Sequence, residues 1–245
     1  MSENPSQTLS PSDPPTVLHT TAGDVALHEY RATFGGHAYR ILHTGAVLTF
    51  LDEQILLSER ETRLPYGVAL WPGAIALAHE IAARPDALHG LRVLELGAGT
   101  GLPGIVAATL GAHVVQTDKQ PAALSLGRLN AERNGAPIVE HRLGDWAAWD
   151  DANQYDRIIG SDILYAAAMH PHLTRIFESN LAPGGRVLLA DPFRRASFGF
   201  LESLEASGWN VLVGRWRVGV KGEESPVGIY ELSKNEGPRN AQNAR

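Results

Sequence analysis

Glycine recurs at short intervals directly after an apolar run, in the segment LELGAGTGLPG from Leu94 to Gly104. Glycines at a strand-to-helix turn let the main chain approach a bound ligand closely, because they carry no Cβ atom. A dinucleotide-binding turn has the spacing G-x-G-x-x-G, which would need a glycine where this chain has Leu102. The spacing therefore disfavours a dinucleotide.

The observed spacing, G-x-G-x-G, is typical of enzymes that bind S-adenosylmethionine (SAM). SAM carries a sulfonium cation and no pyrophosphate. An acid just before the first glycine, Glu95, suits a cationic ligand better than an anionic one. The predicted cofactor contacts of this segment are Glu95, Gly97, Ala98, Gly99, Thr100 and Gly101.

Two further acidic positions follow the next strands along the chain. Asp118 ends the apolar segment HVVQTD, and an acid at that place can accept both ribose hydroxyls, because the ends of the first two parallel strands lie side by side. Asp145 and Trp146 follow the third strand region, where a carboxylate can accept the adenine amino group and an indole can cover the ring. Taken singly, each position also suits a helix cap or a core residue, but their order on one scaffold predicts a SAM site.

The elements that must position these residues alternate strictly between strand and helix patterns from the segment LRVLEL to the segment ASFGFLESLEASG. Such repetition requires parallel strands joined by crossover helices. After Trp209 two β runs flank a polar segment. We therefore predict an α/β, Rossmann-like, doubly wound and mostly parallel seven-stranded sheet that ends in an antiparallel C-terminal hairpin.

Composition also divides the chain. Residues 1–24 are rich in Ser, Pro and Thr and are predicted to be a disordered arm. Residues 25–65 alternate in short patches and predict a small N-terminal β extension. The main α/β domain, with the predicted SAM site, is expected over residues 66–233, and residues 234–245 are expected to be a disordered tail.

Several classes of function are disfavoured. The formal charge of −6 and the lack of a Lys/Arg block argue against nucleic acid. The absence of cysteine excludes disulfides and thiolate metal ligands, and no metal is expected. No apolar stretch reaches the roughly 20 residues of a membrane helix, and no basic, apolar leader is apparent, so a cytoplasmic location without membrane contact is expected.

Two more motifs carry a resemblance to a known family. LWPGAIALA, from Leu70 to Ala78, precedes the glycine segment, and SDILY, from Ser161 to Tyr165, follows the fourth strand. Together with the glycine spacing, the chain resembles the seven-β-strand methyltransferases, and within them the family 16 protein lysine methyltransferases, which have a Trp-Pro segment and a D-x-x-Y signature. The resemblance covers residues 66–190 well and implies a SAM-dependent methyltransferase acting on a protein lysine.

By this resemblance Asp162 and Tyr165 would face the methyl acceptor. Trp71 and Ser161 would touch SAM, together with Gly97, Gly99, Asp118 and Trp146. A lysine amine has a pKa near 10.4 when unperturbed and must lose its proton before it attacks. A carboxylate at the rim can orient the ammonium group, although by itself it would raise the pKa of that amine.

Alternatives remain open at this point. A small-molecule methyltransferase would share the cofactor half. A non-catalytic SAM-binding regulator is the second alternative, and the intact Asp162 and Tyr165 argue against it. Nucleobase and glutamine methylating enzymes usually carry N-P-P-Y or D-P-P-Y where this chain has SDIL. His170 and His172 fit the start of a helix better than a metal site, and the segment from Asp191 to Arg194 either lines the substrate cleft or simply connects a strand to a helix. The oligomeric state is not indicated.

Overall fold

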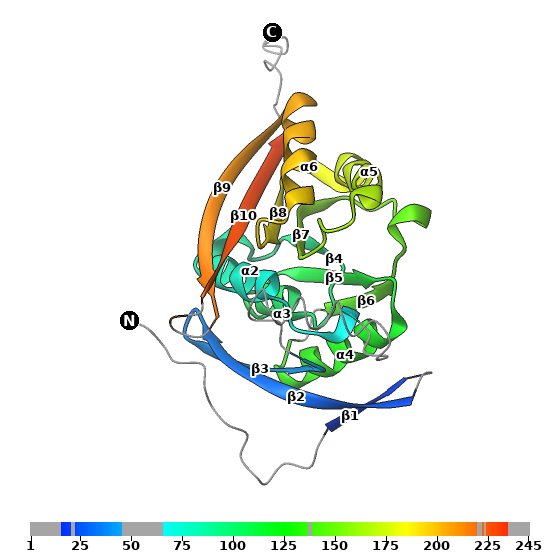
Figure 1. Cartoon of the computed structure of the whole chain (residues 1–245), viewed down its shortest axis with the longest axis vertical. Coiled ribbons are helices and arrows are strands. Elements are labelled where there is room, and N and C mark those ends of the chain that lie inside the picture. The colour runs from blue at the N-terminus through cyan, green and yellow to red at the C-terminus, as the bar shows by residue number, and fades with distance from the viewer. Residues whose placement is uncertain are drawn as a thin grey trace.

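The computed structural model describes residues 16–20, 23–45, 66–136, 139–219, 222 and 224–234. These residues form a central sheet with helices on both sides and a smaller sheet beside it (Figure 1). In chain order the elements are β1 (Thr16–Thr20), β2 (Gly23–Phe34), β3 (His37–His43), η1 (Tyr66–Val68), α2 (Pro72–Ala82), η2 (Pro85–Ala87), β4 (Arg92–Leu96), α3 (Leu102–Thr109), β5 (His113–Asp118), α4 (Pro121–Arg133), β6 (Val139–Leu143), η3 (Trp146–Ala148), β7 (Tyr155–Ser161), η4 (Ala167–Met169), α5 (His170–Asn180), β8 (Leu181–Asp191), α6 (Arg195–Ala206), β9 (Trp209–Val218) and β10 (Ser225–Lys234).

The central sheet has the strand order β6-β5-β4-β7-β8-β10-β9. The pairs from β6 to β8 are parallel, and β10 is antiparallel to both β8 and β9. This arrangement confirms the predicted doubly wound sheet with an antiparallel C-terminal hairpin. The strand order reverses between β4 and β7, and ligands of such sheets bind beyond the carboxyl ends of the strands at this reversal.

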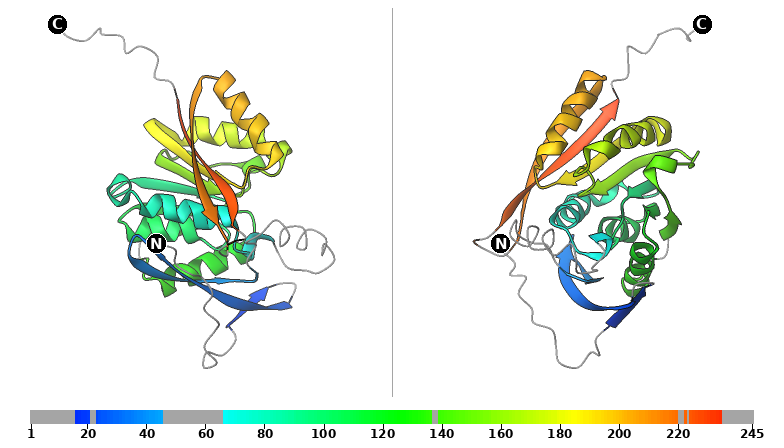
Figure 2. Two further views of the ribbon diagram at one scale, coloured as in Figure 1. Left: turned by 60° about the vertical axis from the view of Figure 1, so that its left-hand side comes forward. Right: turned by 45° about the vertical axis from the view of Figure 1, so that its right-hand side comes forward.

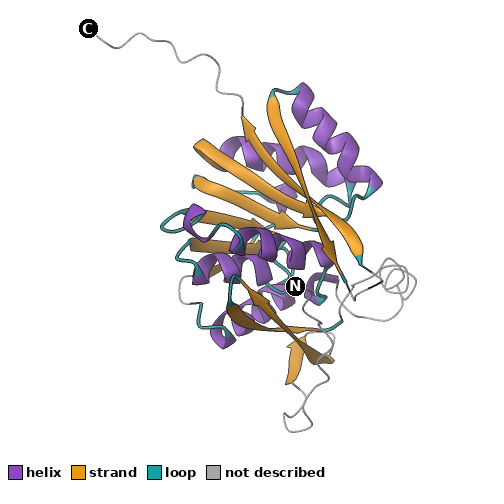
Figure 3. Cartoon of the chain, turned by 90° about the vertical axis from the view of Figure 1, so that its left-hand side faces the viewer, coloured by secondary structure: helices purple, strands orange, loops and turns teal. Residues whose placement is uncertain are grey.

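The inner strands direct alternate side chains to the two faces of the sheet, which helices cover on both sides (Figure 3). In β4, Val93 packs with α2 and α3, whereas Leu94 and Leu96 pack with α5 and α6. In β10, Ile229 packs on the side of α2 and α3, and Tyr230 packs on the side of α5 and α6. The inner strands are therefore buried between two apolar layers, whereas the edge strands β6 and β9 are mostly half-buried or exposed.

Helix boundaries follow sequence signals. The α-helices α2, α3, α4 and α5 each carry a proline in the first turn, where the missing N–H group has no helical partner and the fixed φ suits the helix. Glycines in the left-handed conformation follow α3 and α4, namely Gly111 with φ 91° and Gly135 with φ 61°. These signals confirm the predicted helices on either side of the glycine segment.

The N-terminal strands form a separate antiparallel sheet in the order β1-β2-β3. Its apolar side chains, Leu18, Leu27 and Leu42, pack with Ala123 and Leu126 of α4. Figure 2 shows this sheet beside α4, on the side of that helix away from β9 and β10. The predicted β extension therefore exists and covers a helix of the central domain. Residues 46–65 of the predicted extension lie outside the described residues.

The predicted boundary of the N-terminal arm at residue 24 is wrong. β1 lies within that range, and its five residues pair with β2 from Thr16↔Leu27 to Thr20↔Gly23. The pairing gives the main chain of β1 hydrogen-bond partners, and Leu18 is buried. The content of Ser, Pro and Thr does not indicate either effect. Residues 1–15 lie outside the described residues. At the other end, β10 includes Lys234, which was predicted to begin the tail.

No helix in the described part of the chain is both long and apolar enough to cross a membrane.

Candidate active site

The glycine segment forms the turn between β4 and α3. Gly97, Gly99 and Gly101 all have positive φ angles, of 64°, 55° and 80°. Other residue types rarely adopt this conformation, so the three glycines are needed for the turn itself. The Ala98 N–H donates to the Thr117 carbonyl at 3.0 Å, which ties the turn to the end of β5. The loop is thus fixed at the carboxyl edge of the sheet.

Glu95 lies behind this loop rather than on its ligand side. Its carboxyl is buried and accepts a hydrogen bond from Gln116 Nε2 at 2.7 Å, while the same amide group donates to the Gly101 carbonyl at 2.8 Å. A Cβ atom on Gly104 of α3 would collide with the Glu95 carboxyl. Burial raises the pKa of Glu95 to about 8. The carboxyl is therefore mainly protonated at neutral pH and supports the turn from below, so it does not supply the negative charge expected beneath a cationic ligand.

Asp118 lies at the end of β5, next to the glycine turn. The Gly99 N–H donates to its Oδ2 at 3.2 Å and the Gln120 N–H donates to its Oδ1 at 2.9 Å. Only 8% of Asp118 is exposed, and burial raises the pKa of its carboxyl while these two hydrogen bonds oppose the rise. The structure therefore brings Asp118 and the glycine turn together, as the sequence predicted.

Trp146 begins η3 and lies against the first glycine of the turn. A Cβ atom on Gly97 would be 3.3 Å from Trp146 Cζ2 and 2.9 Å from Ile163 Cγ2. The main-chain oxygen of Trp146 accepts a hydrogen bond from Arg175 Nη2 at 2.9 Å. The indole, the glycine turn and the residue after Asp162 therefore meet at one place.

Asp145 has a local role in the structure. It is exposed, and its Oδ1 accepts the Ala147 N–H at 2.9 Å, which caps the short η3 helix. Capping is the alternative role weighed for such an acid, and the predicted contact with adenine stays a prediction.

Asp162 follows β7 directly and has the left-handed backbone conformation, with φ 55°. Its N–H donates to the Ala190 carbonyl of β8 at 2.8 Å, which turns the carboxyl inward. The buried Oδ2 lies against Gly73 of α2, where a Cβ atom would collide with it. The glycine in the Trp-Pro-Gly segment is therefore explained by the close approach of Asp162.

Arg194 is the partner of this carboxyl. Arg194 Nη1 donates to Asp162 Oδ1 at 2.8 Å and to Asp191 Oδ2 at 2.9 Å. The guanidinium carbon also lies 5.8 Å from the centre of the Trp71 ring, in cation–π geometry. Burial raises the pKa of Asp162 to about 6, although Arg194 opposes the rise and Asp191 adds to it. One arginine thus connects the ends of β7 and β8 with the start of α2.

Sequence reasoning gave Arg194 no specific role. The sequence allows two roles for the segment from Asp191 to Arg194, as a lining of the substrate cleft or as a plain strand-to-helix connection. The structure shows that this segment completes a charged cluster with Asp162. The sequence signal is limited to the spacing of Asp191, at the end of a buried strand, and Arg194 three residues later. The structure adds that Phe193 between them has φ 58°. Non-glycine residues in this conformation gather at functional sites.

Ser161, a predicted contact of SAM, and Tyr165, predicted to face the acceptor, are placed differently from Asp162. Ser161 is the last residue of β7, pairs with Ala190 and is half-buried. Tyr165 lies on the surface with 62% of its area exposed, whereas the Asp162 carboxyl is inside. The D-x-x-Y signature therefore consists of one buried acid and one surface aromatic residue.

The two histidines near this signature lie in the first turn of α5. His170 Nε2 is 3.0 Å from the Leu164 carbonyl oxygen, and its ring packs on Phe200. In the part of the chain that the structure describes, no cluster of His, Asp or Glu side chains is arranged to hold a metal ion. The expectation that no metal takes part stays a prediction, and activity after prolonged chelation is the measurement that tests it.

Comparison with known proteins gives a consistent family. The family model described as "Lysine methyltransferase" matches residues 50–207. Protein N-lysine methyltransferase METTL21A of Danio rerio is 34% identical over 157 residues, which cover 61% of this chain and 71% of that protein. EEF1A lysine methyltransferase 3 of Mus musculus is 31% identical over 137 residues, covering 54% and 59%. Histone-arginine methyltransferase METTL23 of Mus musculus is 35% identical over 117 residues, covering 43% and 46%.

Solved structures share the fold at lower identity. The glycopeptide N-methyltransferase MtfA in complex with SAM has a TM-score of 0.56 and 19% identity, and the match covers 66% of this chain and 94% of that chain. The ribosomal protein L11 methylase of Lactobacillus delbrueckii subsp. bulgaricus has a TM-score of 0.51 and 20% identity, covering 66% and 77%. These likenesses concern the fold and confirm the Rossmann-like class.

Proposed function

This chain belongs to the lysine methyltransferase family, whose model spans residues 50–207, and we propose that it transfers a methyl group from SAM to the side-chain amine of a lysine in another protein. Membership confirms the resemblance drawn from the Trp-Pro, glycine and D-x-x-Y motifs, and with it a SAM-dependent methyltransferase. The identity of the acceptor is the proposed part. The observation that carries the proposal is that all the predicted site residues lie within the matched range.

The residues at the carboxyl edge suit SAM. The glycine turn has the backbone conformation that its positive φ angles require, and the Asp118 carboxylate beside it suits two ribose hydroxyls. Trp146 offers an aromatic face at the same turn. When bound, SAM supplies an electrophilic methyl group on its sulfonium. The chain then has to hold the cofactor, exclude water and align the acceptor nitrogen.

The charged cluster at the ends of β7 and β8 suits an amine acceptor. It contains two carboxyl groups, Asp162 and Asp191, and one guanidinium, so it leaves excess negative charge to attract an ammonium group. A carboxylate alone would raise the pKa of that amine and hold its proton. Arg194 opposes this effect, because a nearby positive charge favours the neutral amine. We therefore assign Asp162 to orientation of the amine and Arg194 to control of its protonation.

Exposed aromatic side chains follow the ends of β7 and β8 along the chain. Tyr165 and Phe198 are both exposed large side chains, and the Phe198 ring stacks on Phe193 with 6.3 Å between ring centres. Aromatic residues of this kind are enriched where protein partners bind. This surface supports a protein acceptor over a small molecule. A cytoplasmic location and the absence of nucleic acid partners stay predictions.

The test is to incubate the full-length protein with SAM labelled on the methyl group and a lysate from cells lacking the gene. Label in a discrete protein band, mapped by mass spectrometry to lysine, is the expected result. The Asp118→Ala variant serves as the control without transfer. Label only in small molecules would favour the small-molecule alternative. Label on arginine would show that the acceptor is an arginine, as the name of the relative METTL23 says of that protein.

A further inference from the structure

A pocket of about 230 Å³ lies at the opposite ends of the strands from the candidate active site. It uses Arg157 near the start of β7 and Arg186 in the middle of β8, whereas Asp162 and Asp191 stand at the carboxyl ends of these strands. Its residue Arg84 follows the end of α2, whereas Trp71 precedes the start of that helix. The pocket shares no residue with the candidate active site.

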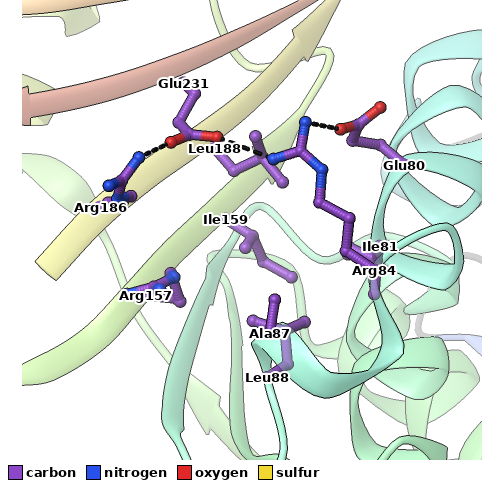
Figure 4. A pocket seen from close by; sticks show the side chains of 10 residues that line it. All are labelled: Glu80, Ile81, Arg84, Ala87, Leu88, Arg157, Ile159, Arg186, Leu188 and Glu231. Atoms are coloured by element: carbon purple, nitrogen blue, oxygen red, sulfur yellow. Dashed lines mark hydrogen bonds and ion pairs between the residues drawn. The ribbon is translucent and has the colours of Figure 1, made fainter.

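The walls of this pocket are charged and its floor is apolar (Figure 4). Glu231 accepts from Arg186 through Oε1 and from Arg84 Nη1 through Oε2, the latter at 3.1 Å. Glu80 Oε1 pairs with Arg84 at 2.8 Å and its Oε2 accepts the Trp216 indole N–H at 2.8 Å. Both carboxylates of the pocket are thus already engaged through both oxygens. The apolar lining consists of Ile81, Ala87, Leu88, Ile159 and Leu188.

Arg157 differs from the other two arginines of the pocket. Its Nη1 donates to the Asp156 main-chain carbonyl at 2.7 Å, and among the described residues no carboxylate forms an ion pair with it. Burial lowers the pKa of Arg157, and the neighbouring Arg186 lowers it further, while Glu231 and Asp156 oppose this. A guanidinium has five donor N–H groups, so Arg157 retains donors directed at no protein acceptor. An anion would stabilise a half-buried guanidinium whose N–H groups lack protein acceptors.

We propose that this pocket is a second ligand site that binds a small organic carboxylate with an aliphatic body. The donor groups of Arg157 and Arg186 suit the two oxygens of a carboxylate. The apolar floor suits a short branched chain. Ligand sites for drug-sized molecules usually enclose roughly 300–1,000 Å³, so a pocket of this size selects a smaller ligand.

The probe is isovalerate, titrated into the full-length protein and followed by ligand-observed NMR. Its neutral isostere isovaleramide and inorganic phosphate are titrated in parallel. Saturable binding of isovalerate, with isovaleramide at least tenfold weaker, is expected. The Arg157→Gln variant is expected to bind isovalerate at least tenfold more weakly, and Leu188→Trp, which fills the floor, is expected to bind none.

Arg92→Gln is the matched control. Arg92 starts β4 at the same end of the sheet and lies over the Tyr155 ring at 5.2 Å, but it does not line the pocket. This variant should bind isovalerate like the wild-type protein, and all variants should keep their affinity for S-adenosylhomocysteine as proof of folding. Equal binding of amide and acid, full binding by Arg157→Gln, absence of saturable isovalerate binding, or binding of phosphate in place of isovalerate would each overturn the proposal.

Discussion

Asn130 of α4 and Leu42 of β3 exchange two hydrogen bonds. The Leu42 N–H donates to Asn130 Oδ1 at 2.8 Å, and Asn130 Nδ2 donates to the Leu42 carbonyl at 3.0 Å. The same Nδ2 also donates to the Thr100 carbonyl of the glycine turn at 2.9 Å. A single buried amide therefore joins the N-terminal sheet to the predicted cofactor loop.

Asn130→Ala should lower both stability and cofactor affinity. The substitution leaves buried main-chain groups of Leu42 and Thr100 without this partner, and each such group costs about 1–3 kcal/mol. We expect a lower free energy of unfolding in urea and several-fold weaker binding of S-adenosylhomocysteine by calorimetry.

The neighbouring amide offers the control. Asn134 Oδ1 accepts the Arg40 N–H and its Nδ2 donates to the Arg40 carbonyl, each at 2.9 Å, without reaching the glycine turn. Asn134→Ala should lower stability but leave the affinity for S-adenosylhomocysteine unchanged. Equal loss of affinity in the two variants would show that Asn130 does not act through Thr100.

Asp118→Ala should weaken binding of S-adenosylhomocysteine by at least tenfold. The variant would remove the proposed hydrogen bonds from ribose to a charged acceptor, each contributing about 1.5–3 kcal/mol. Asp150→Ala is the control, because Asp150 is an exposed carboxylate that pairs with Arg142 of β6. This variant should leave the affinity for S-adenosylhomocysteine unchanged. NAD should show no binding by the same calorimetry, and tighter binding of NAD than of S-adenosylhomocysteine would contradict the glycine-spacing argument.

Asp162 and Arg194 should behave as one unit in a double-mutant cycle. Asp162→Asn should lower turnover on the order of a hundredfold, the scale expected for a misaligned acceptor, with near-normal binding of S-adenosylhomocysteine. Arg194→Gln should also lower turnover and should raise the apparent pKa of the pH–rate profile, because the amine then holds its proton more tightly. The double variant should lose less than the sum of the two single effects.

The cycle is read against thermal unfolding of each variant, so that loss of fold is separated from loss of function. Tyr165→Phe should lose less turnover than Asp162→Asn, because the tyrosine ring is on the surface. Strictly additive effects of Asp162→Asn and Arg194→Gln would mean that the two side chains act separately.

Glu95 should make stability fall as pH rises. Its pKa is raised from 4.5 to about 8 by burial, so the folded state holds a proton that the unfolded state has released. The stabilisation is therefore complete below about pH 4.5 and is lost progressively up to about pH 8. Urea unfolding at several pH values should show this decline in the wild type and a flatter profile in Glu95→Gln. The exposed Glu140→Gln should keep the wild-type profile, and a wild-type slope in Glu95→Gln would contradict the assignment.

The sequence predicted those parts of the molecule that depend on local signals. The alternation of strands and helices, the prolines at helix starts and the glycines of the turn are each set by a few adjacent residues. The N-terminal strand β1 was missed because its order comes from pairing with β2 and from contact with α4, both of which depend on distant residues.

Two site assignments show the same limit. The side chains of Glu95 and Val93 point to the same face of the sheet, toward α3. The sequence signal for this was Gly104, a glycine within α3 that leaves room for the Glu95 carboxyl. Arg194 is 32 positions from Asp162, so no local spacing could indicate their ion pair. The site could be located from strand ends alone, but the charge balance within it required the tertiary structure.

The left-handed backbone at Asp162 and Phe193 implies a compromise between stability and activity. Each such non-glycine residue costs about 1 kcal/mol or more relative to an unstrained backbone. Glycine adopts this conformation without steric strain, although it loses more conformational entropy on folding than other residues. The side chains at these two positions make contacts that glycine could not make, because Asp162 pairs with Arg194 and the Phe193 ring packs on Phe198 and Tyr230. The backbone strain at this edge of the sheet is therefore a cost of keeping these side chains in place, and it limits how far the region could be stabilised without losing them.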